Sequence, residues 1–342
     1  MFIDKPSKRL LLSFIIAATN IFSFAFGIAV TGDRRSNVDV VAASSGASTP
    51  ILSPTAGARP AAKQTAAKVV AAPAPHAADV AAMPSATPSP SIPIAGKGMW
   101  IYEFDLIMGG NVQKIVDVSK AYGLTHLYVR AGTTRSGLDT WPDVLKILPV
   151  AHAAGLKVIP WYFPYLRNPA ADARRTIAMV RTVVNGHRVD GFAADIETRA
   201  EGTKLSTKAV KQYIDTVRKG APEAFMILVP PRPNSYTVRF YPYHLVPRFD
   251  AVAPMVYWGG VDPAKATADA VSYLKRYNRP VAPIGQVYDM GPEGGPKGRP
   301  KPPALRRFMN EARMRGSVGL SFWSWQHSSI PQWVAIRAFP WP

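Results

Sequence analysis

The chain of 342 residues contains no cysteine. This absence excludes a disulfide scaffold and any zinc site with thiolate ligands, although it leaves the cellular compartment open. Histidine is scarce as well, because the 6 histidines are scattered without a pair four residues apart or an adjoining acidic motif. A histidine-ligated zinc site is therefore not expected, and nothing in the sequence calls for a metal or another cofactor.

Two motifs of common enzymes are also missing. The sequence contains no Gly-x-Ser-x-Gly elbow and no phosphate-binding loop, which argues against a serine hydrolase or a nucleotide enzyme. After the first apolar run of the second half, where a dinucleotide-binding sheet would have glycines, the chain has Glu103-Phe104-Asp105. An open doubly wound sheet is therefore the weaker alternative for the fold.

Acidic residues are few relative to basic ones, with 22 Asp and Glu against 41 Lys and Arg and a net charge of +19. Most of this excess falls on residues 97–342, which predicts an anionic partner. The alternative is a general basicity spread over helix surfaces. Because the amino-terminal segment indicates export, we expect acidic wall polymers, peptidoglycan carboxylates or a lipid surface, and no nucleic acid.

The amino-terminal part divides into two segments without a core. Residues 10–30 contain no charged side chain and follow Lys5, Lys8 and Arg9, so residues 1–38 are expected to be either a cleaved signal peptide or an uncleaved membrane anchor. Residues 39–96 are dominated by Ala, Pro, Ser and Thr, which predicts a disordered linker. The protein is thus expected to be exported, either to the cell envelope or out of the cell. The linker is then either a tether or a segment whose length has not been selected.

Residues 97–342 alternate apolar runs with amphipathic helical patterns. The runs predict eight strands, over residues 99–103, 125–130, 156–163, 191–197, 225–230, 251–258, 280–288 and 318–325. The helical patterns include residues 112–122, 170–184, 207–219, 264–277 and 303–315. Eight strand–helix units predict a single α/β domain of the (β/α)8 TIM-barrel type.

In such a barrel the active site gathers at the carboxyl ends of the strands. The residues at those ends are mainly carboxylates and aromatics: Glu103, Asp105, Arg130, Trp161, Tyr162, Asp195, Glu197, Arg232, Met255, Tyr257, Trp258, Gln286, Tyr288, Asp289, Trp323, Trp325, Gln326 and His327. Aromatic faces that stack on sugar rings, together with paired carboxyls, are what glycan hydrolysis requires. The alternative is that several aromatics simply fill the top of the barrel.

The segment Val189-Asp190-Gly191-Phe192-Ala193-Ala194-Asp195-Ile196-Glu197 provides the strongest chemical signal. Side chains alternate along a strand, so Asp195 and Glu197 share one face. Burial and the neighbouring carboxylate disfavour the charged form of Glu197, which makes it the expected general acid, with Asp195 ionised beside it. The alternative is a buried ion-pair network in which Arg130 and Arg232 neutralise both carboxylates.

Residues 189–197 resemble the fourth-strand signature of family 18 glycoside hydrolases, which ends in Asp-x-Glu with the Glu as proton donor. Met255-Val256-Tyr257 is similar to the sixth-strand Met-x-Tyr of that family, and Trp323 or Trp325 is similar to its eighth-strand tryptophan. The resemblance implies cleavage of an N-acetylated sugar, with Asp195 orienting the acetamido group and Tyr257 donating a hydrogen bond to it. The Asp-x-Glu ending is also similar to that of family 25 lysozyme-like barrels, and the whole domain resembles a bacterial group of glycoside-hydrolase-like barrels.

Two departures from the family 18 pattern leave a second function open. Ala193 stands where that family has a further acidic residue, and Trp258 stands where its Met-x-Tyr is followed by Asp. We therefore expect either a glycoside hydrolase acting on an N-acetylated envelope glycan, such as peptidoglycan or a chitin-like polymer, or a glycan-binding barrel without turnover. The Gly- and Pro-rich residues 291–303 are interpreted as a lid over the barrel mouth or as a solvated loop.

Overall fold

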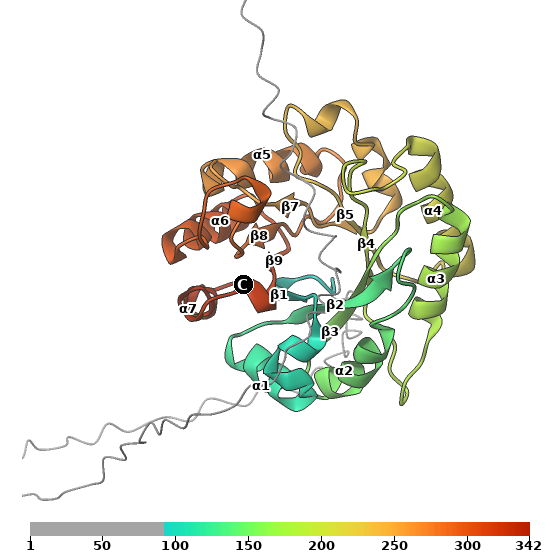
Figure 1. The fold of residues 1–342 in the computed structure, drawn as a ribbon, viewed down its shortest axis with the longest axis horizontal. Coiled ribbons are helices and arrows are strands. Elements are labelled where there is room, and N and C mark those ends of the chain that lie inside the picture. The colour runs from blue at the N-terminus through green and yellow to red at the C-terminus, as the bar shows by residue number, and fades with distance from the viewer. Residues whose placement is uncertain (1–91) are drawn as a thin grey trace, which may run out of the picture. The chain divides into compact units, whose positions relative to one another are not determined.

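The computed structural model describes residues 92–342, shown in colour in Figure 1. The predicted anchor and nearly all of the predicted linker lie outside the described residues. The first described residues belong to the barrel, because Ile94 is fully buried and the first strand, β1 (Gly96–Ile101), begins before residue 97. The folded part of the chain therefore starts earlier than the change in composition indicates.

The strands form one parallel sheet that curls into a barrel. Their hydrogen-bonded order is β6-β5-β4-β3-β2-β1-β9-β8-β7. After β1 the strands are β2 (His126–Thr133), β3 (Lys157–Phe163), β4 (Phe192–Asp195), β5 (Met226–Val229), β6 (Ala251–Val252), β7 (Met255–Val256), β8 (Ile284–Gln286) and β9 (Gly319–Trp323). The sequence-based prediction of an α/β barrel is confirmed.

The two short strands β6 and β7 are halves of one predicted strand, residues 251–258. Pro254 lies between them, and proline has no N–H to donate to a sheet. Parallel bridges from Pro231 to Met255 and from Val252 to Val281 join these halves to their neighbours and close the barrel. With β6 and β7 taken together, the barrel has the eight strands that the sequence predicts.

Helices surround the barrel in Figure 1. They are α1 (Val112–Ala121), α2 (Trp141–Ala153), α3 (Pro169–Arg181), α4 (Thr207–Gly220), α5 (Pro263–Lys275), α6 (Pro302–Met314) and α7 (Ile330–Ala338). Side-chain caps define several of their starts: Asn111, Asn168, Ser206 and Asp262 each accept a hydrogen bond from a backbone N–H in the first turn. Among the described residues, no helix is long and apolar enough to cross a membrane.

The connection from β5 to β6 departs from the repeating pattern. It contains two 3-10 segments, η3 (Thr237–Arg239) and η4 (Tyr243–Arg248), in place of an α-helix. Pro242 precedes η4 and Pro247 lies inside it, and proline in a helix interior removes a backbone hydrogen bond and clashes with the preceding turn. This side of the barrel is therefore covered by turns.

Side-chain alternation separates the core into two layers. Along β1, Met99 and Ile101 pack outward against the helices, whereas Trp100 faces the barrel interior with Tyr128 of β2. The interior layer also includes small residues of β4 and β6, such as Ala193 and Ala251. Large residues on some strands and small ones on others fill the barrel without leaving a pore.

The first strand and the last helix meet at the amino-terminal end of the barrel, which we call the floor. Lys97 is only 6% exposed, and its Nζ donates hydrogen bonds to the carbonyl oxygens of Ile336 (2.8 Å) and Phe339 (2.9 Å). These carbonyls are at the end of α7, where a helix leaves acceptors unpaired. The opposite end of the barrel, where the strands terminate, we call the mouth.

Candidate active site

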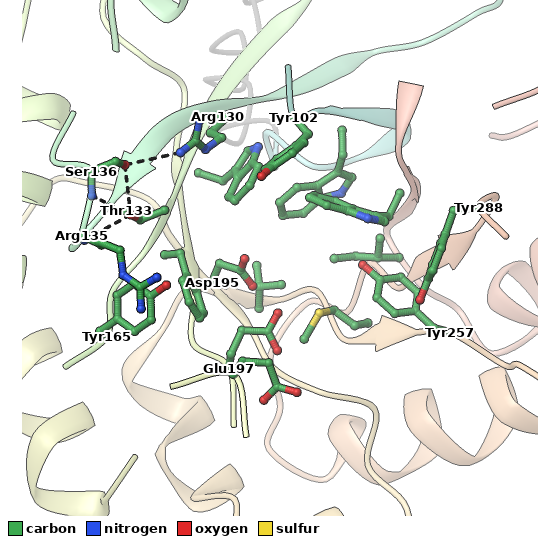
Figure 2. A pocket seen from close by; sticks show the side chains of 18 residues that line it. Tyr102, Arg130, Thr133, Arg135, Ser136, Tyr165, Asp195, Glu197, Tyr257 and Tyr288 are labelled. Atoms are coloured by element: carbon green, nitrogen blue, oxygen red, sulfur yellow. Dashed lines mark hydrogen bonds between the residues drawn. The ribbon is translucent and has the colours of Figure 1, made fainter. Parts of the chain in front are cut away.

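Strand β4 brings the paired carboxylates to the mouth. Asp195 is its last residue and Glu197 follows two positions later, and both line a cavity of about 350 Å³ (Figure 2). The intervening Ile196 packs outward in the main core, as the two-residue alternation of a strand requires. Asp195 is 8% exposed, and its Oδ1 is buried without a hydrogen-bond partner.

Burial and like charge favour the protonated form of both carboxyls. Desolvation, followed by the charge of Glu201, raises the pKa of Asp195 to about 8. Desolvation, followed by Asp195, Glu201 and Glu293, raises the pKa of Glu197 well above its usual value. Because the two carboxyls interact, they titrate as a pair that keeps its protons to higher pH than an isolated carboxyl would.

The expectation that Asp195 is ionised at neutral pH does not agree with this raised pKa. The difference arises first from the burial of Asp195 and then from Glu201, which lies on the loop after β4 and lines the same cavity. Sequence reasoning placed only one neighbouring carboxylate beside Asp195. The protonated form of Asp195 therefore persists to higher pH than that of an ordinary carboxyl.

One wall of the cavity is built from aromatic rings of strands β1, β3 and β9. Trp100, Trp161 and Trp323 approach one another with ring centroids 5.4 to 5.7 Å apart, and Tyr102 stacks on Trp161 at 6.1 Å. The indole N–H of Trp161 donates to the carbonyl oxygen of Ile101 (3.1 Å), which fixes the orientation of the ring. This wall offers flat apolar surfaces of the kind on which sugar rings stack.

The adjoining wall contains Tyr257 and Tyr288, whose rings meet edge to face at 5.4 Å (Figure 2). Met255, from β7, lies on the same side. The Tyr288 hydroxyl donates to Glu293 Oε2 (3.1 Å), so the loop after β8 is tied to this wall. Burial raises the pKa of Tyr257 well above its usual value, and its hydroxyl therefore remains a hydrogen-bond donor.

Arg130 lies at the rim above the carboxylates without pairing with them. Its NH2 group donates to Asp139 (3.1 Å) and to Ser136 (3.4 Å), and its guanidinium lies 5.4 Å from the Tyr102 ring centre. Arg232 does not line the cavity, and no ion pair joins either arginine to Asp195 or Glu197 within residues 92–342. The alternative of a buried ion-pair network is therefore not what the structure has.

Of the residues at the strand ends, all but Asp105, Gln326 and His327 were predicted for catalysis or substrate binding, and eight of these fifteen come together around this cavity. They are Arg130, Trp161, Asp195, Glu197, Met255, Tyr257, Tyr288 and Trp323.

The other predicted residues lie elsewhere. Tyr162 points outward from β3 and donates to Asp172 (3.1 Å), because it has the opposite parity to Trp161. Trp258 packs on Phe308 at 5.5 Å, and Trp325 packs on Trp333 at 4.8 Å, both in the outer core.

The remaining four residues make hydrogen bonds with backbone groups or lie apart from the cavity. Gln286 is buried and accepts a hydrogen bond from the Gly259 N–H (3.0 Å). Asp289 accepts from the N–H groups of Gly291 and Gly298, which holds the loop after β8. Glu103 is exposed with its carbonyl bonded to Gln326 (3.0 Å), and the Arg232 carbonyl accepts from Thr237 (2.8 Å). Their position at strand ends thus does not bring these side chains into the cavity.

Several lining residues were not among the predicted ones: Trp100, Tyr102, Thr133, Arg135, Ser136, Phe163, Tyr165, Glu201, Val229 and Ile284. The first two have a sequence signal, since Trp100 and Tyr102 are two residues apart at the end of an apolar run. Arg135 and Glu201 lie on loops after β2 and β4, where no periodicity indicates direction.

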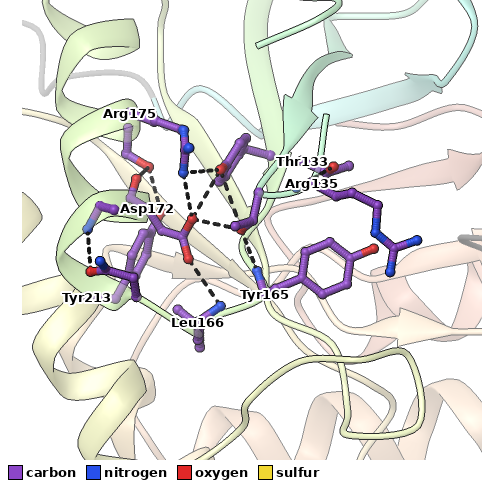
Figure 3. Close-up of polar contacts among 12 residues, drawn as sticks. Thr133, Arg135, Tyr165, Leu166, Asp172, Arg175 and Tyr213 are labelled. Carbon is purple, nitrogen blue, oxygen red and sulfur yellow. Dashed lines mark hydrogen bonds and ion pairs between the residues drawn. The ribbon is translucent and has the colours of Figure 1, made fainter. Parts of the chain in front are cut away.

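A buried hydrogen-bond network supports the rim on the β2 and β3 side (Figure 3). Asp172 of α3 is fully buried and accepts from the Thr134 hydroxyl (2.7 Å) and the Leu166 N–H (3.1 Å). The Thr134 hydroxyl oxygen in turn accepts from the Tyr165 N–H (2.8 Å), and the Arg135 guanidinium lies 5.4 Å from the Tyr165 ring centre. The network therefore fixes the loops that present Arg135 and Tyr165 to the cavity.

The arrangement supports acid catalysis on a ligand held between aromatic walls. Glu197 is a carboxyl whose raised pKa favours its protonated form, Asp195 lines the same cavity, and Tyr257 offers a hydroxyl donor. No group of metal-ligating side chains able to hold an ion occurs within residues 92–342.

No family model and no curated protein sequence matches the chain. Solved structures do match. The endo-beta-1,4-mannanase of Thermotoga petrophila has a TM-score of 0.56 at 12% identity, covering 72% of this chain and 76% of the mannanase chain. A family 18 chitinase from Cycas revoluta, solved in complex with (GlcNAc)4, has a TM-score of 0.54 at 9% identity, covering 71% of this chain and 99% of the chitinase chain.

The spore cortex-lytic enzyme SleL of Bacillus cereus matches with a TM-score of 0.53 at 13% identity, covering 72% of this chain and 75% of the SleL chain. At such low identities the similarity shows the fold, a TIM barrel of the type these glycoside hydrolases have. It confirms the barrel that the resemblance to family 18 implies. The reaction has to be argued from the cavity itself.

Proposed function

We propose that the protein is a glycoside hydrolase that cleaves an N-acetylated glycan of the cell envelope, with Glu197 as the general acid. The observation that carries the proposal is the pair of protonatable carboxyls, Asp195 and Glu197, facing a cavity walled by tryptophan and tyrosine. Protonation of the leaving oxygen requires a carboxyl that keeps its proton near neutral pH, and burial gives Glu197 that property.

The neighbours of Glu197 complete the chemistry. After losing its proton, Asp195 stabilises positive charge on the sugar or orients the acetamido group, and Tyr257 donates a hydrogen bond to that group. The aromatic wall of Trp100, Trp161 and Trp323 stacks against the sugar ring. Peptidoglycan and chitin-like polymers contain such N-acetylated sugars, and the export signal and basic charge of the chain favour an envelope substrate.

A glycan-binding barrel without turnover is the second candidate, favoured by Ala193 and Trp258 at positions where family 18 has acids. Two observations weigh against it. Trp258 is buried against Phe308, and Arg130 pairs with Asp139, so neither residue caps Glu197. Glu197 lines the cavity directly, which catalysis by this carboxyl requires.

The test is the release of reducing ends from peptidoglycan and from chitin-type oligosaccharides, together with a pull-down of each polymer. We expect the Glu197→Gln protein to lose about 10²-fold or more in turnover, since it cannot donate the proton, while it still binds the polymer. The exposed Glu223→Gln variant is the matched control and should remain fully active. Turnover retained in Glu197→Gln would exclude Glu197 as the acid, and binding without turnover by the unmodified protein would establish the second candidate.

A further inference from the structure

The rim of the cavity on the β2 side is cationic, in contrast to the carboxylates near its centre. Arg130, Arg135 and Ser136 all line the cavity on this side (Figure 2). Asp139 is the ion-pair partner of Arg130, and its side chain is 35% exposed, so its charge is partly screened by solvent. Arg135 has no ion-pair partner among the described residues, and this rim therefore has an excess of positive charge.

Arg130 has hydrogen-bonding capacity that the protein does not use. Its side chain is 9% exposed, and its Nε is buried without a hydrogen-bond partner, whereas both recorded bonds of the guanidinium come from NH2. The Nε is closed to solvent, so the group that a ligand can reach is NH1, which makes no hydrogen bond within the described residues. An accessible guanidinium donor without an acceptor, at the edge of a cavity, indicates an acceptor supplied by a ligand.

The rim is rigid enough to select a ligand. Thr133 Oγ1 accepts from the N–H groups of Arg135 (3.2 Å) and Ser136 (3.0 Å), and the two hydroxyls of Thr133 and Ser136 are 3.0 Å apart. The Asp172 network holds Tyr165, on whose ring Arg135 lies. The cationic groups are therefore positioned before a ligand arrives.

From these contacts we propose that Arg130, Arg135 and Ser136 form a subsite for a carboxylate carried by the substrate sugar, so that the cavity selects an acidic glycan. This inference rests on the proposed function and deepens it. A planar guanidinium matches a carboxylate with two parallel hydrogen bonds, and a cavity of about 350 Å³ accommodates a sugar ring with a short acidic substituent. The raised pKa of Asp195 is consistent with such a ligand, because protonated acids do not repel an anion.

Two kinds of sugar supply this chemistry: one with a lactyl ether, as in muramic acid, and one with a uronic acid. The test measures equilibrium binding to the full-length Glu197→Gln protein by calorimetry. The ligands are the N-acetylglucosamine disaccharide, the N-acetylglucosaminyl-muramic acid disaccharide, its carboxamide, and a disaccharide of N-acetylglucosamine and glucuronic acid. We expect at least one acidic disaccharide to bind about 10-fold more tightly than the neutral one, and we expect the carboxamide to lose this advantage if the lactyl sugar is the preferred one.

Three variants separate recognition from damage to the fold. Arg135→Gln and Arg130→Gln should each reduce the preference for the acidic ligand, and Arg135 is exposed, so its loss spares the core. Asp139→Asn should increase the preference, because it removes the competing carboxylate from Arg130 NH2. If Asp139 only supports the local structure, Asp139→Asn would instead weaken the binding of acidic and neutral ligands alike.

The outcomes distinguish this inference from the function beneath it. Equal affinity for the acidic and neutral disaccharides would overturn the subsite while leaving glycan binding intact. Binding of none of the disaccharides would overturn the proposed function and the subsite with it. A preference for either the lactyl or the uronic sugar supports the subsite and identifies the source of the carboxylate.

Discussion

Glu201 shows how strongly one residue on a loop sets the chemistry of the site. Its charge raises the pKa of Asp195 after desolvation, and that of Glu197 after desolvation and the charge of Asp195. A raised pKa means that the acid form of Glu197 persists to higher pH, so the alkaline limb of the pH–rate profile should report the loss of this proton.

Glu201→Gln removes one negative charge from the site. Because the pKa of Glu197 then falls, we expect the alkaline limb of the pH–rate profile to move to lower pH. The profile is measured as reducing-end release across the pH range, with Glu223→Gln as the control whose profile should not move. An unchanged profile in Glu201→Gln would show that its charge does not act on the catalytic acid.

For single residues, the sequence predicts which way a side chain points along a strand, but it predicts little about side chains outside the strands. The two-residue period correctly places Asp195 and Glu197 on one face, with Ile196 on the other. The same period distinguishes Trp161 in the cavity from Tyr162 in the outer layer, although both were expected at the site. Glu201 and Glu293 could not be predicted, because loop side chains follow no period and their directions depend on tertiary contacts.

Helix α3 contributes to the site through a single buried carboxylate. Asp172 is 0% exposed and joins the loops after β2 and β3 through the Thr134 hydroxyl and the Leu166 N–H. Asp172→Ala leaves these donors without an acceptor, and we expect it to lower the free energy of unfolding by about 2–4 kcal/mol.

Urea unfolding followed by fluorescence measures this change. The control is Asp269→Ala on α5, which removes only an exposed pair with Lys265 and should cost about 0.5 kcal/mol or less. Equal effects of the two substitutions would mean that the Asp172 network does not hold the loops together.

The sequence predicts the positions of whole strands better than it predicts the positions of single side chains. Each predicted strand overlaps a strand of the barrel, because apolar runs of four to eight residues bounded by turn signals are typical of buried parallel strands. The break at Pro254 and the 3-10 turns near Pro242 and Pro247 have a visible cause in the missing proline N–H. The start of the barrel near Ile94 was harder to predict, because a few apolar residues at the end of a Pro- and Ala-rich segment form no pattern.

For the molecule as a whole, Lys97 joins the beginning of the barrel to its end. Lys97→Met keeps the apolar stem but removes the donors for the Ile336 and Phe339 carbonyls. We expect the free energy of unfolding to fall by about 2–4 kcal/mol, since two acceptors near the end of α7 lose their partner. Urea unfolding and the rate of proteolytic cleavage near α7 measure the effect.

The exposed Lys120→Met on α1 serves as the control and should unfold at the same urea concentration as the unmodified protein. If Lys97→Met behaved like Lys120→Met, the contact between the first strand and the last helix would be incidental to stability.

The Lys97 contact also determines how the protein can be attached to a surface. Since it places residue 97 and the end of α7 together on the floor, the two ends of the barrel lie opposite the cavity. A thiol introduced at either end would be unique, because the chain has no cysteine of its own. Coupled to a bead or a sensor chip through that thiol, every molecule would be immobilised in the same orientation, with the mouth of its barrel turned toward the solution.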